Sequence, residues 1–153
     1  MAQSAFHYVT YIRAAPERVW SALTDRAVIP RYWFGMTCDS DWRPGRPWKL
    51  TFADGRIADE GEILESEPPK KLVIKWFNTF RPELAAEGPA RCAMLLEPQG
   101  VATKLTVRHE MDAPRSLVIE AVSDGWPKIL SNLKSLLETG EVAITLGAAE
   151  AAR

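Results

Sequence analysis

Apolar and polar residues along this chain follow two different periods, which divide it into elements. Residues 6–13 (FHYVTYIR) are rich in aromatic and β-branched side chains and favour a half-buried strand. Over residues 14–26 apolar side chains recur at helical spacing, and Pro16 suits a first helical turn. A further helical turn is expected over residues 27–33, interrupted at Pro30. The pattern predicts one strand followed by two short helices.

From residue 36 to residue 107 the period is two, which is typical of antiparallel strands with one solvated face. Turn residues separate the expected strands, which cover residues 36–42, 47–52, 56–67, 71–78, 91–98 and 101–111. The acidic run over residues 59–67 indicates a solvated face on an exposed or edge strand. Residues 79–90 are expected to form a long loop.

One long amphipathic helix is expected from about residue 115 to residue 139, ended by Gly140. Because Pro127 lies inside it, the helix either kinks there or restarts with Asp124 as its cap. A single helix cannot cover both faces of a sheet of about seven strands. We therefore expect an α+β fold, in which a curved antiparallel sheet wraps around this helix and the two short helices close one end.

Length and charge limit the classes of protein that fit. The 153 residues suit one domain, expected over residues 6–140, between an N-terminal tail (1–5) and a loosely held C-terminal tail (141–153). A net charge of -1 argues against a nucleic-acid partner, and no run approaches the ~18 apolar residues of a membrane span. Cys38 and Cys92 are too few for a disulfide framework or a thiolate zinc site, so we expect a reduced, cytoplasmic protein without a bound metal.

The six tryptophans are the main compositional bias. Strand alternation places most of the large side chains of the sheet on the face toward the long helix, together with a few polar groups, namely Ser40, Asn78, His109 and the two cysteines. We expect Trp20 to be a packing residue. A ligand cavity between sheet and helix is the sharper hypothesis, with a predicted lining of Trp33, Trp48, Trp76, Met94, His109, Trp126 and Leu130.

Catalytic motifs are weak. Ser40, His109 and Asp59 could be combined as a triad, but no GxSxG elbow accompanies them, and no glycine-rich phosphate loop indicates a nucleotide cofactor. We therefore assign no catalytic residue, metal or cofactor. His109 is expected to be a hydrogen-bonded strand histidine, and a general base is the alternative.

Three strings carry a family resemblance: YWFGMTCDSDWRPGRPW (32–48), DGRIADEGEILESEPPKKLVIKW (54–76) and DGWPKILSNLKSLLETG (124–140). They resemble the bacterial relatives of the activator of the heat-shock chaperone ATPase, within the START-like (SRPBCC, helix-grip) superfamily. The resemblance spans about residues 6–140. It implies a helix-grip fold with a hydrophobic cavity and no fixed catalytic set.

Three functions stay open. A small-molecule binding protein for a hydrophobic or lipid-like ligand ranks first, so we expect a binding protein in preference to an enzyme. A cyclase- or aromatase-like enzyme using the same cavity ranks second. A chaperone co-factor or regulatory partner ranks third, because the resemblance covers only one domain of the eukaryotic activator. A homodimer is left open as a further partner.

Overall fold

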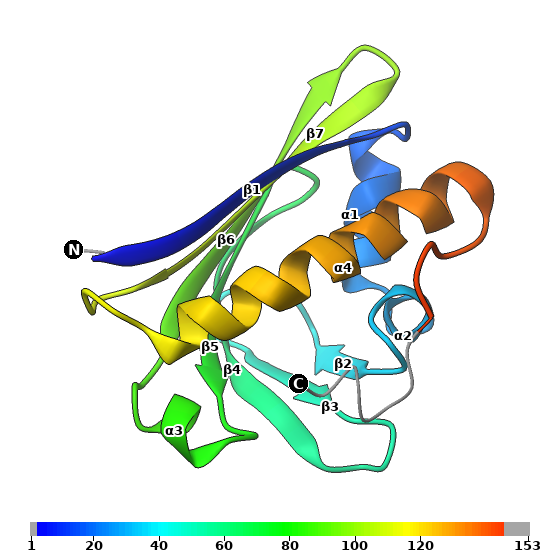
Figure 1. Ribbon diagram of the computed structural model, residues 1–153. Coiled ribbons are helices and arrows are strands. Elements are labelled where there is room, and N and C mark those ends of the chain that lie inside the picture. Colours follow the sequence, from blue (N-terminus) through cyan, green and yellow to red (C-terminus); the bar gives the residue numbers. More distant parts are fainter. Residues whose placement is uncertain (1–2, 146–153) are drawn as a thin grey trace.

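The computed structural model describes residues 3–145 (Figure 1). Its elements run in the order β1 (Ser4–Ile12), α1 (Pro16–Thr24), α2 (Ile29–Tyr32), β2 (Thr37–Ser40), β3 (Pro47–Thr51), β4 (Ile57–Glu67), β5 (Lys71–Asn78), α3 (Pro82–Ala85), β6 (Ala90–Gln99), β7 (Ala102–Met111) and α4 (Leu117–Thr139). Residues 146–153 of the expected C-terminal tail lie outside the described part of the chain.

The seven strands form one sheet in the order β1-β7-β6-β5-β4-β3-β2, and every neighbouring pair is antiparallel. The sheet curves around α4, which lies along its concave face, while α1 and α2 close one end (Figure 1). Alternating side chains of the strands therefore face α4, where their apolar surface is buried. This arrangement confirms the expected α+β fold with a curved sheet around a long C-terminal helix.

β4 was expected to be an exposed or edge strand, and the edge position was wrong. β4 lies between β3 and β5, and the edge strands are β1 and β2. Its polar residues arise because the outer face of the sheet is solvated: Glu60 is exposed, whereas Asp59 and Ile63 on the inner face are buried. The acidic composition of β4 therefore reflects the solvated outer face of the sheet and not an edge position.

Gly61 of β4 makes the concave face possible at its centre. Its register partners are Trp48 on β3 and Trp76 on β5. A Cβ atom at this position would lie 1.7 Å from the carbonyl oxygen of Lys75, far inside any real contact. With no side chain between them, the rings of Trp48 and Trp76 approach to 4.3 Å between centroids. The glycine thus allows both a close strand approach and a pair of packed indoles.

Helix α4 runs unbroken through Pro127, so the restart at Asp124 does not occur. Its cap is Ser116, whose hydroxyl accepts a hydrogen bond from the Ile119 N–H (3.1 Å). Glu87 adds to this cap by accepting from the Ser116 hydroxyl (2.7 Å) and the Leu117 N–H (2.8 Å). As expected, the helix ends at Gly140, which has a φ of 87°.

Two segments that were expected to be irregular are held by specific contacts. The loop after β5 contains α3, whose Leu84 is fully buried. At the other end of the molecule, the buried Asn132 of α4 accepts a hydrogen bond from the Ile144 N–H (2.7 Å) and donates one to its carbonyl (2.9 Å). The start of the predicted C-terminal tail is therefore fixed against α4.

Candidate functional site

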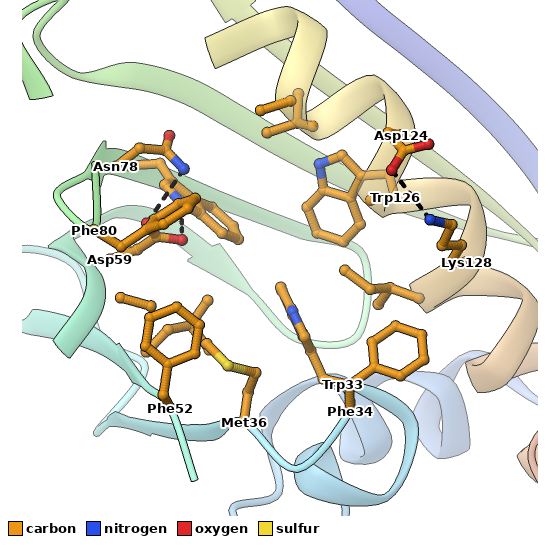
Figure 2. A pocket seen from close by; sticks show the side chains of 17 residues that line it. Trp33, Phe34, Met36, Phe52, Asp59, Asn78, Phe80, Asp124, Trp126 and Lys128 are labelled. Atoms are coloured by element: carbon orange, nitrogen blue, oxygen red, sulfur yellow. Dashed lines mark hydrogen bonds and ion pairs between the residues drawn. The ribbon is translucent and has the colours of Figure 1, made fainter. Parts of the chain in front are cut away.

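A cavity of about 110 Å³ lies between the concave face of the sheet, the segment joining α2 to β2, and the middle of α4. Its wall is mostly aromatic and aliphatic, and the residues that line it are Trp33, Phe34, Met36, Leu50, Phe52, Ala58, Asp59, Trp76, Asn78, Phe80, Ala121, Val122, Asp124, Gly125, Trp126, Lys128 and Ile129. Figure 2 shows Trp126 approaching from α4, Trp33 and Phe34 from the opposite segment, and Phe52 with Phe80 on a third side.

Three indoles form the centre of this wall. The ring centroid of Trp33 lies 5.9 Å from that of Trp76 and 5.4 Å from that of Trp126, and the last two lie 5.7 Å apart. The Trp76 N–H donates to the Asp59 carboxylate (3.0 Å), and the Trp126 N–H donates to Nδ1 of His109 (3.1 Å). Because both N–H groups are used within the protein, these two rings can offer a ligand their faces and carbon edges.

The turn after α2 brings Trp33 and Phe34 to the cavity. Phe34 and Gly35 both have positive φ angles, of 51° and 79°. A left-handed conformation is common for glycine and uncommon for a bulky residue such as phenylalanine. The chain therefore turns sharply at the cavity wall, and an unusual backbone at such a place is a mark of candidate functional sites.

Asp59 is the polar feature of the cavity that the sequence-based prediction missed as a site residue. Asp59 is 6% exposed, and its carboxylate accepts hydrogen bonds from the Trp76 N–H and from the Asn78 side-chain amide (3.2 Å). Burial raises the pKa of Asp59 to about 7, and the bonds from Trp76 and Asn78 lower it only in part. A signal existed in the sequence: period two from Ile63 through Gly61 places Asp59 on the inner face.

Asn78 sits next to Asp59 on the neighbouring strand and also lines the cavity. It is 4% exposed, and its side-chain oxygen has no hydrogen-bond partner among the described residues. A buried amide oxygen without a partner loses stabilising interactions with water, so it marks a place where a donor from a ligand or a water would be favourable.

The rim of the cavity is charged and open to solvent. Asp124 and Lys128 lie one turn apart on α4 and form an ion pair of 3.1 Å, drawn as a dashed line in Figure 2. Their side chains are 69% and 40% exposed. Since an exposed pair of this kind contributes little to stability, these side chains are free to move apart, and we take this rim as the entrance.

The seven residues predicted to line a cavity divide into two groups. Trp33, Trp76 and Trp126 lie on the cavity wall, whereas the others lie behind it in the core, namely Trp48, Met94, His109 and Leu130. Whether any of the seven contacts a ligand stays a prediction. The alternation of the strands identified the inner face correctly, but Met94 and Leu130 are packed within the core and do not reach the cavity wall.

His109 is placed as a core residue and not as a solvent-accessible base. It is fully buried, and burial lowers its pKa to about 3, so the ring is neutral near pH 7. Because Nδ1 accepts from Trp126, the ring proton is assigned to Nε2, which has no partner in the described structure. His109 therefore supports Trp126 from behind the cavity wall.

Cys38 and Cys92 are both buried and free, and they lie on β2 and β6 with three strands between them. Burial raises the pKa of the Cys38 thiol to about 12, so it is an unreactive thiol at neutral pH. Within residues 3–145 no three His, Cys, Asp or Glu side chains are grouped so as to hold a metal ion. In the same part of the chain, no helix has the length and apolar character needed to cross a membrane.

The curved sheet, the long C-terminal helix and the cavity between them define a helix-grip protein. More specifically, residues 13–138 match the family described as Activator of Hsp90 ATPase homolog 1-like protein, and the chain belongs to this family. The predicted resemblance to relatives of the chaperone activator is thereby confirmed. The comparison with curated proteins gave no match.

Solved structures of similar fold include three proteins whose low identity supports the fold alone. Protein MLL2253 from Mesorhizobium loti is 22% identical with a TM-score of 0.77, over 91% of this chain and 100% of that one. CalU16 from Micromonospora echinospora is 24% identical with a TM-score of 0.71, over 89% and 77%. The Aha1 dimer from Colwellia psychrerythraea is 19% identical with a TM-score of 0.71, over 90% and 98%.

Proposed function

We propose that this protein binds a small, compact molecule in the cavity between its sheet and α4. The observation that carries the proposal is the wall itself: a cluster of three indoles lines a space that also meets the buried Asp59 and Asn78. A core that served packing alone would gain by filling this space with apolar side chains. The family resemblance supports a cavity at this place.

The volume narrows the hydrophobic or lipid-like ligand predicted from the sequence. An engineered apolar cavity of about 150 Å³ holds benzene, and typical pockets for drug-sized ligands span about 300–1,000 Å³. The space of about 110 Å³ therefore suits a ring-sized molecule or a compact end of a longer one. A long acyl chain would need Trp33 or α4 to move.

The expected affinity follows from the same size. The best very small ligands gain at most about 1.5 kcal/mol per non-hydrogen atom, so a ligand of about six atoms reaches at most about 9 kcal/mol. This corresponds to a Kd no tighter than roughly 0.1–1 μM, and weaker values are usual. Screening therefore belongs at micromolar to millimolar ligand concentrations.

Thermal shift and native mass spectrometry with a panel of ring-sized compounds test the proposal. The matched variants are Gly125→Leu, which places a side chain at the cavity wall, and Ser131→Leu, which places the same side chain on α4 away from it. We expect ligands to stabilise the wild type and Ser131→Leu but not Gly125→Leu. The proposal fails if no compound binds, or if both variants bind alike.

An enzyme using the same cavity is the second candidate, and Asp59 is the observation that favours it. A carboxyl group with a pKa of about 7 is well matched to proton transfer near neutral pH. Its position on the wall makes Asp59, and not the enclosed His109, the residue to test. For a candidate substrate, turnover that survives in Asp59→Asn would exclude this mechanism.

Two further proposals are that the protein acts as a chaperone co-factor and that it forms a homodimer. Each is supported by a single observation. Family membership supports the co-factor role, which a pull-down against the chaperone would test. The similar Aha1 from Colwellia psychrerythraea forms a dimer, which supports a homodimer here, and light scattering would test it. A cytoplasmic location also stays a prediction, supported by the two free thiols.

A further inference from the structure

Several groups on the cavity wall attract positive charge. Asp59 contributes a carboxylate, and the indoles of Trp33, Trp76 and Trp126 contribute aromatic surface. Aromatic faces carry negative electrostatic potential and attract cations within about 6 Å of the ring centroid. The three ring centroids lie within 6 Å of one another, so the indoles pack as one cluster, and a group lying against this cluster would contact more than one ring.

Positive charge is scarce at the same place. The ionisable residues on the wall are Asp59, Asp124 and Lys128, and Lys128 is paired with Asp124 at the exposed rim. No Lys or Arg of the described chain forms an ion pair with Asp59. Buried carboxylates are costly unless they are paired. The described part of the protein therefore supplies no counter-ion for the Asp59 carboxylate.

The Asp59 carboxylate also has room for a further donor. Two carboxylate oxygens offer about four lone-pair sites. Asn78 donates to one oxygen and Trp76 donates to the other. The Thr79 backbone also contributes a hydrogen bond to Asp59. These donors hold the carboxylate in place and still leave acceptor capacity on it. A bound N–H group could therefore complete an existing arrangement without displacing either residue.

From these observations we infer that the cavity selects a small organic cation, an ammonium compound whose charge pairs with Asp59 and whose apolar part lies against the indoles of Trp33, Trp76 and Trp126. This inference rests on the proposed binding function and adds the chemical class of the ligand. The alternative ligand is a neutral hydrogen-bond acceptor, which would bind a protonated Asp59. The aromatic wall and the absence of a Lys or Arg paired with Asp59 in the described chain favour the cation.

Three ring compounds with the same number of non-hydrogen atoms separate these cases: cyclopentylamine, cyclopentanol and cyclopentanone. The amine is a cation at pH 8, like a lysine side chain of pKa about 10.4. The alcohol is neutral and can donate a hydrogen bond, and the ketone can only accept one. Titration calorimetry with each compound at pH 8 measures the preference. We expect the amine to bind at least about tenfold more tightly than either neutral ring.

Two controls tie the preference to Asp59. In Asp59→Asn, verified as folded by thermal unfolding, the amine should lose its advantage and bind about as weakly as the alcohol. If that variant does not fold, a pH series on the wild type serves instead. Affinity for the amine should fall several-fold from pH 8 to pH 6 as Asp59 takes up a proton. The other ionisable groups on the cavity wall are Asp124 and Lys128 of α4, and the buried His109 on β7 stays neutral over this range because burial lowers its pKa to about 3.

The outcomes distinguish this inference from the proposed function. Tightest binding of cyclopentanone would show that Asp59 acts as a neutral donor and would overturn the inference. Equal binding of the amine and the alcohol would overturn it too, while leaving the binding function in place. If none of the three compounds binds at millimolar concentration, and ring-sized compounds of other chemistry also fail, the binding function and the inference fall together.

Discussion

Substitution of Gly125 by alanine should make the protein more stable and a weaker binder at the same time. Gly125 lies within α4, its φ is not in the left-handed region, and a Cβ atom there would meet nothing within 4 Å. Glycine in a helix interior costs about 0.8–1.0 kcal/mol relative to alanine. A methyl group that is partly buried adds a fraction of about 0.8 kcal/mol. The free energy of unfolding should rise by about 1–1.5 kcal/mol.

For a chain of this size, 1 kcal/mol shifts Tm by about 2–4 °C, so Gly125→Ala should raise Tm by about 3–5 °C. Urea unfolding followed by tryptophan fluorescence and by circular dichroism would measure the free energy. The same samples would be titrated with the ring-sized ligand, because the added methyl group occupies part of the cavity of about 110 Å³. We expect affinity to fall as stability rises.

Ser131→Ala is the matched control, since it also places alanine on α4 but away from the cavity. It should change stability by about 0.5 kcal/mol or less and leave binding as in the wild type. The reasoning is refuted if Gly125→Ala destabilises the protein, because the backbone or the neighbouring side chains would then need glycine. A stabilised variant with unchanged affinity would mean that the ligand binds elsewhere.

Further predictions concern the sheet, the cap of α4 and pH. Gly61→Ala should lower the free energy of unfolding by about 3 kcal/mol or more in a urea titration, because its Cβ would collide with a neighbouring carbonyl; a loss below about 1 kcal/mol would contradict this. Glu87→Gln should lower the free energy of unfolding by about 1 kcal/mol because it weakens the cap of α4. Glu83→Gln, at an exposed residue, is the control and should have no effect. Equal effects of the two substitutions would rule out the cap. Burial raises the pKa of Asp59 from 3.8 to about 7 and lowers that of His109 from 6.5 to about 3. Between about pH 4 and 6.5 the folded chain therefore holds a proton on Asp59 that the unfolded chain has lost, so this residue makes stability rise as pH falls. Over the same range His109 is neutral in the folded chain and protonated in the unfolded chain, so it makes stability fall as pH falls. The two effects cancel. Asp59→Asn should remove the first effect, so that its stability falls relative to the wild type as pH decreases below about 6.5; parallel curves of unfolding free energy against pH would contradict this.

Local patterns in the sequence were sufficient for most of the fold. Period two located the strands, and the apolar stripe of residues 117–137 located α4, because each pattern reflects burial of one face. The order of strands was harder to predict. Pairing depends on contacts between distant residues, so nothing local distinguished the central β4 from an edge strand. The four-residue helix α3 was missed because one turn leaves no periodic signal.

The candidate site was predicted in part for a related reason. Large inward side chains pointed to Trp33, Trp76 and Trp126, which meet at the cavity. The alternation of inward and outward side chains along the strands could not distinguish these wall residues from Trp48, which packs behind Trp76 across Gly61. That distinction depends on the curvature of the sheet and on the height at which α4 crosses it.

The sequence analysis considered Asp59 only in a triad that it rejected, and did not predict it as a cavity residue, because Asp59 begins an acidic run whose other members are mostly solvated. Its burial follows from the alternation of β4 and from its register with Asn78, which the structure provides. A single carboxylate within an acidic segment was therefore the most informative residue of the site. Its charge decides which ligand chemistry the cavity favours.

The central claim is that a small ligand enters the cavity lined by the three wall indoles. The side-chain N–H signals of the six tryptophans report on it directly. A nitrogen-15 correlation spectrum, assigned with tryptophan-to-phenylalanine variants, would be recorded during titration with cyclopentylamine at pH 8. We predict saturable shifts of the Trp33, Trp76 and Trp126 signals, while those of Trp20 and Trp42 stay in place. Unchanged spectra at saturating ligand, or shifts confined to Trp20 and Trp42, would contradict the account.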